Sequence, residues 1–252
     1  MNAKTYISDL PYSDLGGAAL GQLTAAERKK LAFQNARRVQ SSVLTSAEKR
    51  ILLWLAERTP LWVDSDHLTL LGLMAQLAVG ASYALSRWDR RALLLATFFL
   101  AVNWLGDSLD GTLARYRNRQ RPRYGFYVDH IIDSFGALFL MTGLALSGYM
   151  HPLVAMALLT AFLMLSIEVY LATYALASFH LSFFGLGPTE IRLVLAIGNL
   201  ALFMRGPWAH IAGHVYSLFD IGAVVAVAGM GMMLISASLR HALQLYREER
   251  LR

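Results

Sequence analysis

Long apolar runs separated by short polar connections occupy most of the chain. Six runs are long enough for a helix to cross a bilayer, and they fall near residues 67–86, 92–113, 127–148, 153–178, 188–205 and 217–238. Residues 1–60 are more polar and contain no run of that length. The pattern predicts an all-α integral membrane protein, with six transmembrane helices in a domain at 61–240 and a basic tail at 241–252.

Two helix-start patterns stand in the N-terminal region, which we expect to be cytosolic and helical. A capping box from Thr24 to Glu27 predicts a basic helix that continues to Arg38. A second box, from Thr45 to Glu48, opens a segment in which apolar and charged residues alternate. Because a predicted span follows so closely, we interpret this segment as an amphipathic helix in the membrane interface, with an ordinary surface helix as the alternative. Its apolar residues are Ile51, Leu52, Trp54 and Leu55.

Composition agrees with a membrane protein. The chain is 56% hydrophobic and 16% charged, whereas soluble domains carry about 25% charged residues. Cysteine is absent, which excludes disulfides and thiolate metal sites. The net charge of +6 comes mostly from the N-terminal region, one loop and the tail. Such clusters next to predicted spans indicate contact with anionic lipid rather than with nucleic acid.

The same basic clusters predict the orientation of the chain. With six spans, the N-terminal region, the loop from Arg117 to Arg123 and the tail lie on one side of the membrane. The positive-inside rule makes that side cytosolic, so we expect both termini there. Arg87, Arg90 and Arg91 fall on the opposite side and count against this orientation.

Two pairs of aspartates carry the clearest chemistry. Asp107 and Asp110 are three residues apart near the end of the second span, and Asp129 and Asp133 are four apart at the start of the third. Either spacing places both carboxylates on one helix face. Because a short loop joins these spans, we expect them to be antiparallel neighbours that bring all four side chains to one depth, near the cytosolic surface.

Four unpaired carboxylates at membrane depth are unfavourable, since each costs about 2.5–3.5 kcal/mol at the centre of a span. Hard divalent cations reverse this cost, and oxygen ligands favour Mg²⁺, Mn²⁺ or Ca²⁺. Gly111 and Ala114 share the face of the first pair and leave room for a ligand, although small residues also serve helix packing. Arg115 can pair with a phosphate. A structural aspartate or a proton relay explains one carboxylate better than it explains four.

The whole stretch resembles the signature of the CDP-alcohol phosphotransferase family. Residues 107–115 read D-x-x-D-G-x-x-A-R, nine residues follow, and residues 125–133 read G-x-x-x-D-x-x-x-D. The resemblance implies a metal-dependent transferase of class 2.7.8, active in phospholipid biosynthesis and assembled as a homodimer. It also implies a fold of six spans preceded by an interfacial helix.

The resemblance further implies a role for each signature residue. Two divalent ions, Mg²⁺ or Mn²⁺, would be bound by Asp107, Asp110, Asp129 and Asp133. Asp133 would also act as general base, with Asp129 beside it in catalysis. The CDP moiety would be held by Asp107, Gly111, Ala114, Arg115 and Gly125. His130 falls between signature positions, and its helical spacing predicts that it points away from the two aspartates of its own helix.

Further polar residues are candidates for the acceptor site or for supporting contacts. Thr69 stands at the start of the first span, where the family carries a nucleotide-binding element that is only partly present here. Intramembrane charges are functional candidates by default, and those predicted at the depth of the aspartates are Glu168, Glu190 and Arg192. Tyr170 joins them because Glu168 and Tyr170, followed by G-P-T-E at 187–190, resemble elements of the eukaryotic aminoalcohol phosphotransferases.

Donor and acceptor are therefore open between two branches of the family. In the first, a phosphatidyl group passes from CDP-diacylglycerol to a small alcohol, and the short six-span chain resembles this branch. In the second, CDP-choline or CDP-ethanolamine gives its headgroup to diacylglycerol. An intramembrane prenyltransferase would lack the G-x-x-A-R continuation. A cation or proton transporter would spread its carboxylates across the membrane.

Overall fold

The computed structural model describes residues 37–39, 45–176, 178–180, 188–206, 208–211 and 214–249. The helices in this part of the chain are α4 (Thr45–Arg58), α5 (Ser65–Leu85), α6 (Ala92–Tyr116), α7 (Pro122–Ser147), α8 (Pro152–Leu176), α9 (Pro188–Arg205) and α10 (Leu218–Glu248). Four short strands accompany them: β1 (Arg37–Val39), β2 (Ser178–His180), β3 (Trp208–Ile211) and β4 (His214–Ser217). The predicted all-helical fold is confirmed.

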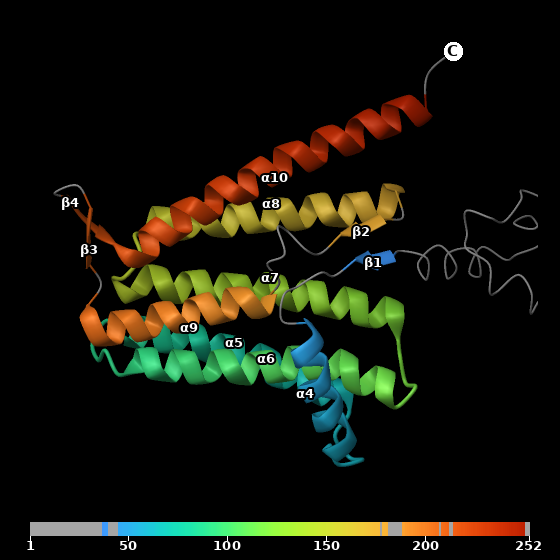
Figure 1. The fold of residues 1–252 in the computed structure, drawn as a ribbon, viewed down its shortest axis with the longest axis horizontal. Helices are drawn as coiled ribbons and strands as arrows, with labels where there is room; N and C mark the ends of the chain where they lie inside the picture. Colours follow the sequence, from blue (N-terminus) through green and yellow to red (C-terminus); the bar gives the residue numbers. More distant parts are fainter. Residues whose placement is uncertain are drawn as a thin grey trace, which may run out of the picture.

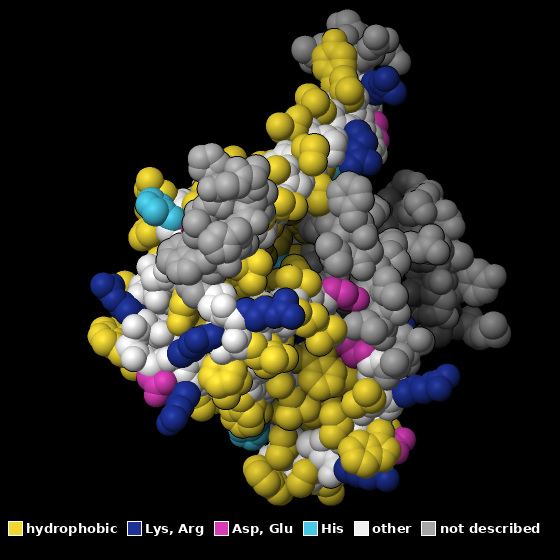
Figure 2. Space-filling view, turned by 60° about the vertical axis from the view of Figure 1, so that its left-hand side comes forward, with side chains coloured by type: hydrophobic (Ala, Val, Ile, Leu, Met, Phe, Trp, Pro, Cys, Tyr) yellow, Lys and Arg dark blue, Asp and Glu magenta, His cyan; other side chains and the backbone are white. Residues whose placement is uncertain are grey.

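Five of the six predicted spans are helices long and apolar enough to cross a membrane, namely α5, α6, α7, α8 and α10. The protein is therefore a multi-pass membrane protein. Helix α9 occupies the position predicted for the fifth span, but its 18 residues include Glu190, Arg192 and Arg205. Those charges keep α9 outside the set of clearly apolar helices. Figure 2 shows hydrophobic side chains over much of one face, with Lys and Arg in a few separate groups.

The long helices run roughly side by side, with α5 and α6 at one edge of the bundle, α8 and α10 at the other, and α7 between them (Figure 1). Helix α5 packs on both α6 and α7. Helix α8 packs on α7, α9 packs on α6, and α10 packs mainly on α8. Glycines permit the closest approaches. A Cβ at Gly143 would lie 2.1 Å from the carbonyl oxygen of Gly80, and one at Gly106 would lie 2.7 Å from the amide nitrogen of Gly72. Close backbone approach of this kind is the usual basis of helix association in lipid.

A buried polar contact joins three helices inside the bundle. The Tyr83 hydroxyl of α5 donates to Asn199 Oδ1 of α9 at 2.9 Å, and Asn199 Nδ2 donates to Thr97 Oγ1 of α6 at 3.1 Å. Tyr83 and Asn199 are fully buried. The contact fixes α9 against α5 and α6, which matters because α9 supplies a charged residue to the site.

Helix α4 runs across the long helices and packs against α6 (Figure 1). Its buried Leu52 and Ala56 form an apolar cluster with Leu68, Leu109 and Leu113. Among the described side chains of α4, the apolar Ile51, Leu53 and Trp54 are exposed. This distribution suits a helix that lies at a membrane surface, and the interfacial placement remains a prediction.

Arg117 secures the linker between α4 and α5. Its guanidinium donates to the backbone carbonyls of Thr59, Pro60 and Val63 at 2.5–2.9 Å. At the start of α5, Asp64 and His67 form a capping box. These contacts fix the beginning of α5 beside the end of α6, where the aspartates lie.

Three details differ from the sequence-based expectation. Arg37 and Arg38 belong to β1, which pairs in parallel with β2, so the predicted basic helix does not reach them. The rest of that helix, from Thr24 onward, lies outside the described residues. Helix α10 continues to Glu248, past the predicted boundary at residue 240. Strands β3 and β4 form an antiparallel hairpin between α9 and α10.

Candidate active site

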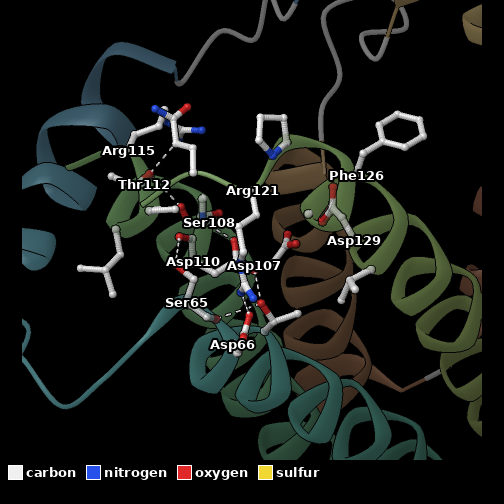
Figure 3. Close-up of a pocket in the computed structure, with 18 of the residues that line it drawn as sticks. Ser65, Asp66, Asp107, Ser108, Asp110, Thr112, Arg115, Arg121, Phe126 and Asp129 are labelled. Atoms are coloured by element: carbon white, nitrogen blue, oxygen red, sulfur yellow. Dashed lines mark hydrogen bonds and ion pairs between the residues drawn. The ribbon is translucent and has the colours of Figure 1, made fainter. Parts of the chain in front are cut away.

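A short turn places the two aspartate pairs beside each other. Helix α6 ends at Tyr116 and α7 begins at Pro122, a residue well suited to the first turn of a helix because it lacks an amide hydrogen. The five residues between them reverse the chain. Asp107 and Asp110 on α6 therefore face the space that Asp129 enters from α7 (Figure 3).

Three of the four predicted metal ligands come together. Asp107, Asp129 and Asp133 each offer a carboxylate oxygen, and these oxygens lie within 4.8 Å of one another. Asp107 and Asp129 are partly buried, whereas Asp133 is exposed toward the cavity. Such a set of hard oxygen donors fits a divalent cation such as Mg²⁺ or Mn²⁺, because like charges this close repel unless a cation lies between them.

Asp110 lies outside this group of three. Its carboxylate accepts a hydrogen bond of 2.6 Å from the Thr69 hydroxyl of α5 and another from the backbone N–H of Gly111. Its backbone carbonyl accepts from the Ser65 hydroxyl at 2.9 Å. The structure thus gives Thr69 a direct contact with Asp110, although the family's nucleotide-binding element around Thr69 is only partly present in the sequence. Ser65 was not predicted, since nothing in its spacing relates it to the aspartates.

Replacing Thr69 by valine tests whether this hydrogen bond matters. We expect the ratio kcat/KM for CMP release to fall about tenfold or more, since a hydrogen bond to a charged group contributes about 1.5–3 kcal/mol. Valine matches threonine in shape, so folding should be unaffected. Thr160→Val, at an exposed position of α8, is the matched control. Equal rates in the two variants would show that Asp110 does not depend on Thr69.

Arg192 enters the site from the first turns of α9. Its Nη2 lies 2.6 Å from Asp107 Oδ2, and its Nε donates to Asn103 Oδ1 at 2.8 Å. Asn103 in turn donates to the Gly72 carbonyl of α5 at 3.0 Å. Asn103 was not predicted as a site residue, although it precedes Asp107 by one helical turn. Among the described residues, no hydrogen-bond partner meets the buried Nη1 of Arg192.

A cavity of about 1100 Å³ opens beside the carboxylates. All eight signature residues line it, together with Thr69 and Arg192. Among the described residues, a Cβ at Gly125 would meet no atom within 4 Å, so this position leaves open space on the α7 side. At the rim, Arg119 pairs with Asp64 at 3.5 Å and Arg121 pairs with Asp66. The cavity is large enough for a nucleotide and a second small molecule.

Three candidates lie outside the cavity wall that the described residues form. Glu168 of α8 pairs with His241 of α10, with Oε1 and Nδ1 2.6 Å apart. Tyr170 packs against the His130 ring, with ring centroids 5.0 Å apart. Glu190, near the start of α9, also lies apart from the wall. Glu168 and Glu190 thus lie apart from the wall, whereas Tyr170 lies directly behind it, against His130. Of the other candidates, the structure brings Thr69 and Arg192 to the aspartates.

His130 lies closer to the site than its spacing predicted. It lines the cavity, and its Nδ1 is 2.6 Å from the Phe126 carbonyl oxygen and 3.9 Å from Asp129 Oδ2. The prediction that it points away from Asp129 is wrong. Stacking on the Phe126 ring, with centroids 4.2 Å apart, turns the imidazole toward the start of α7.

Comparison with known proteins agrees with the geometry. A family model described as CDP-alcohol phosphatidyltransferase matches residues 62–237. The comparison with curated proteins returns no match. The family consists of membrane transferases of phospholipid biosynthesis, in class 2.7.8, and is generally dependent on divalent metal. With the match extending over well more than half of its length, this chain is a member of the CDP-alcohol phosphatidyltransferase family.

Proposed function

We propose that the protein transfers a phosphatidyl group from CDP-diacylglycerol to a small water-soluble alcohol and releases CMP. The observation that carries the proposal is the group formed by Asp107, Asp129 and Asp133 in the wall of a large cavity that also contains several basic side chains. A diphosphate donor needs such a cluster, because cations held there can offset its negative charge. When bound, a divalent ion would supply electrostatic stabilisation of the diphosphate and of the leaving CMP.

The remaining chemistry is assigned to side chains of the chain itself. Asp133 would accept the proton of the acceptor hydroxyl while the oxygen of that hydroxyl bonds to the phosphorus next to the diacylglycerol group. The bond from that phosphorus to the oxygen of CMP then breaks. Arg115 would hold a donor phosphate, while Gly111 and Gly125 leave space beside it. Positioning and electrostatics, without a covalent intermediate, would account for the rate.

The charged rim of the cavity favours a small acceptor. Its rim includes Arg119 and Arg121, whose side chains are more than half exposed. A water-soluble alcohol can enter past such a rim, whereas diacylglycerol would have to approach from the lipid. We propose that the cavity opens to the cytosol and that both termini lie on that side, in keeping with the basic loop between α6 and α7.

The second candidate is an aminoalcohol phosphotransferase that uses diacylglycerol. It is favoured by the pair formed by Glu168 and His241, which joins α8 and α10 away from the cavity wall. An ionisable pair between two apolar helices could receive the hydroxyl of a lipid acceptor. The two candidates differ in both donor and acceptor, so one screen separates them.

The purified protein should release CMP from CDP-diacylglycerol when Mg²⁺ or Mn²⁺ and the correct alcohol are present. We would compare serine, inositol phosphate and glycerol phosphate as acceptors with CDP-choline plus diacylglycerol. EDTA should abolish the release of CMP. The Asp107→Asn variant should release no CMP at any metal concentration. Release of CMP from CDP-choline plus diacylglycerol, but not from CDP-diacylglycerol, would favour the second candidate. No release from any donor would contradict the proposal.

A further inference from the structure

Glu48 of α4 links three helices at the edge of the cavity, although it lies outside the signature. Its Oε1 accepts hydrogen bonds from Trp104 Nε1 at 2.8 Å and from Ser108 Oγ at 3.4 Å, both on α6. The same oxygen accepts from Thr189 Oγ1 of α9 at 2.8 Å. Glu48 is partly buried and borders the cavity. One carboxylate oxygen therefore joins α4, α6 and α9.

These contacts lie beside those of Arg192. Arg192 donates to Asn103 and Asp107. The next residue after each of these on α6, Trp104 and Ser108, donates to Glu48. On α9, Thr189 stands one helical turn before Arg192. Two parallel links thus connect the same turn of α9 to the same two turns of α6.

The second link has a physical reason. Arginine is long and flexible, so an ion pair alone tolerates movement of the helix that carries it. A short threonine side chain bonded to a fixed carboxylate does not. Helix α4 can provide that fixed point, because Leu52 and Ala56 are buried against Leu109 and Leu113 of α6.

We infer that Glu48 is a positioning residue, which holds the first turn of α9 against α6 and thereby keeps Arg192 on the carboxylate of Asp107. The inference rests on the proposed function for its kinetic consequences. It adds that α4, which contains no signature residue, takes part in the arrangement of the site.

Kinetics of four variants test whether Glu48 acts through Arg192. Glu48→Ala should lower kcat/KM for CMP release about 10- to 100-fold, since small misplacements of catalytic groups have effects of this size. Glu48→Gln should retain most of the rate, because an amide oxygen still accepts the three hydrogen bonds. In an Arg192→Gln background, Glu48→Ala should add less than about twofold. Losses that multiply instead would overturn the inference.

Single hydrogen bonds provide a matched comparison. Thr189→Val removes only the bond to α9, whereas Trp104→Phe removes one bond to α6 and leaves the bond to α9 in place. We expect Thr189→Val to reproduce the kinetic loss of Glu48→Ala and Trp104→Phe to be milder. The reverse order would show that Glu48 serves to attach α4, which contradicts a role in positioning α9.

A distance measurement separates this inference from the proposed function. The chain has no cysteine, so Arg50→Cys and Val194→Cys introduce two unique sites for spin labels, on exposed positions of α4 and α9. Glu48→Ala should broaden the distance distribution measured by EPR, and Glu48→Gln should not. An unchanged distribution in Glu48→Ala overturns the inference whatever the activity. A broadened distribution in a protein that releases no CMP would support the positioning of α9 and refute the proposed reaction.

Discussion

Asp133→Asn is expected to lower the rate of CMP release about a thousandfold, a size typical of the loss of a general base. The carboxylate of Asp133 lies in the cluster with Asp107 and Asp129 and is exposed to the cavity. An amide fills nearly the same volume, so packing of α7 should not change. It cannot accept a proton at neutral pH, and it is a weaker ligand for a divalent cation.

The control for this variant is Asp89→Asn. Asp89 lies in the connection between α5 and α6, at the opposite end of α6 from the cluster, and its Oδ1 accepts from the backbone N–H of Arg91. An amide oxygen preserves that contact, so activity should be normal. Measurements at saturating Mn²⁺ distinguish two roles of Asp133. A rate that recovers there would mean that Asp133 serves only as a ligand and that its assignment as base is wrong.

The helices of the bundle were predictable because their signal is local. Apolar runs of sufficient length located α5, α6, α7, α8 and α10 to within a few residues at most ends. The chief exceptions are the start of α7 and the end of α10. Polar residues such as Arg240 and Gln244 ended the predicted span, but they do not end a helix, because both are good helix formers.

The pairing of carboxylates across α6 and α7 was predictable for a similar reason. Two helices joined by only five residues have little freedom, so sequence spacing nearly determines the proximity of the aspartate pairs that they carry. The separation of Asp110 from Asp107, which joins Asp129 and Asp133, was not predictable from the sequence. Thr69 and Ser65 of α5 engage Asp110, and that contact depends on how α5 packs against α6.

Contacts made by α9 and α4 could not be predicted from sequence spacing, because the partners are far apart along the chain. Arg192 is 85 positions from Asp107 along the chain, and Glu48 is 141 positions from Thr189. The sequence predicts Arg192 at the depth of the aspartates but does not identify Asp107 as its partner. Glu48 follows Thr45 by three residues, and this spacing predicts only a capping box. Only the packing of the helices reveals its contacts with Trp104, Ser108 and Thr189.

Gly143→Ala is expected to destabilise the protein strongly, because its added Cβ makes the shortest contact found for any glycine of the described residues. The new Cβ would lie 2.1 Å from the carbonyl oxygen of Gly80 and 2.6 Å from its Cα, so α5 and α7 would have to separate. Overpacking of this kind costs about 1–3 kcal/mol, which corresponds to a fall in Tm of several degrees for a chain of this length. Thermal unfolding in detergent measures it.

Gly229→Ala is the matched control, because a Cβ there would meet no atom within 4 Å among the described residues. Alanine also favours a helix by about 1 kcal/mol over glycine, so the control should melt at the same temperature or slightly higher. Gly80→Ala should resemble Gly143→Ala, since its Cβ would lie 2.3 Å from the Phe139 carbonyl oxygen.

A double variant that combines Gly80→Ala with Gly143→Ala tests the backbone contact between α5 and α7. Once one methyl group has separated the helices, the second meets less resistance, so the double variant should lose less stability than the sum of the single losses. The separation should also lower activity, because α5 carries Thr69 and α7 carries Asp129 and Asp133 to the wall of one cavity. A Gly143→Ala protein that melts like Gly229→Ala would show that the two backbones do not meet in this way.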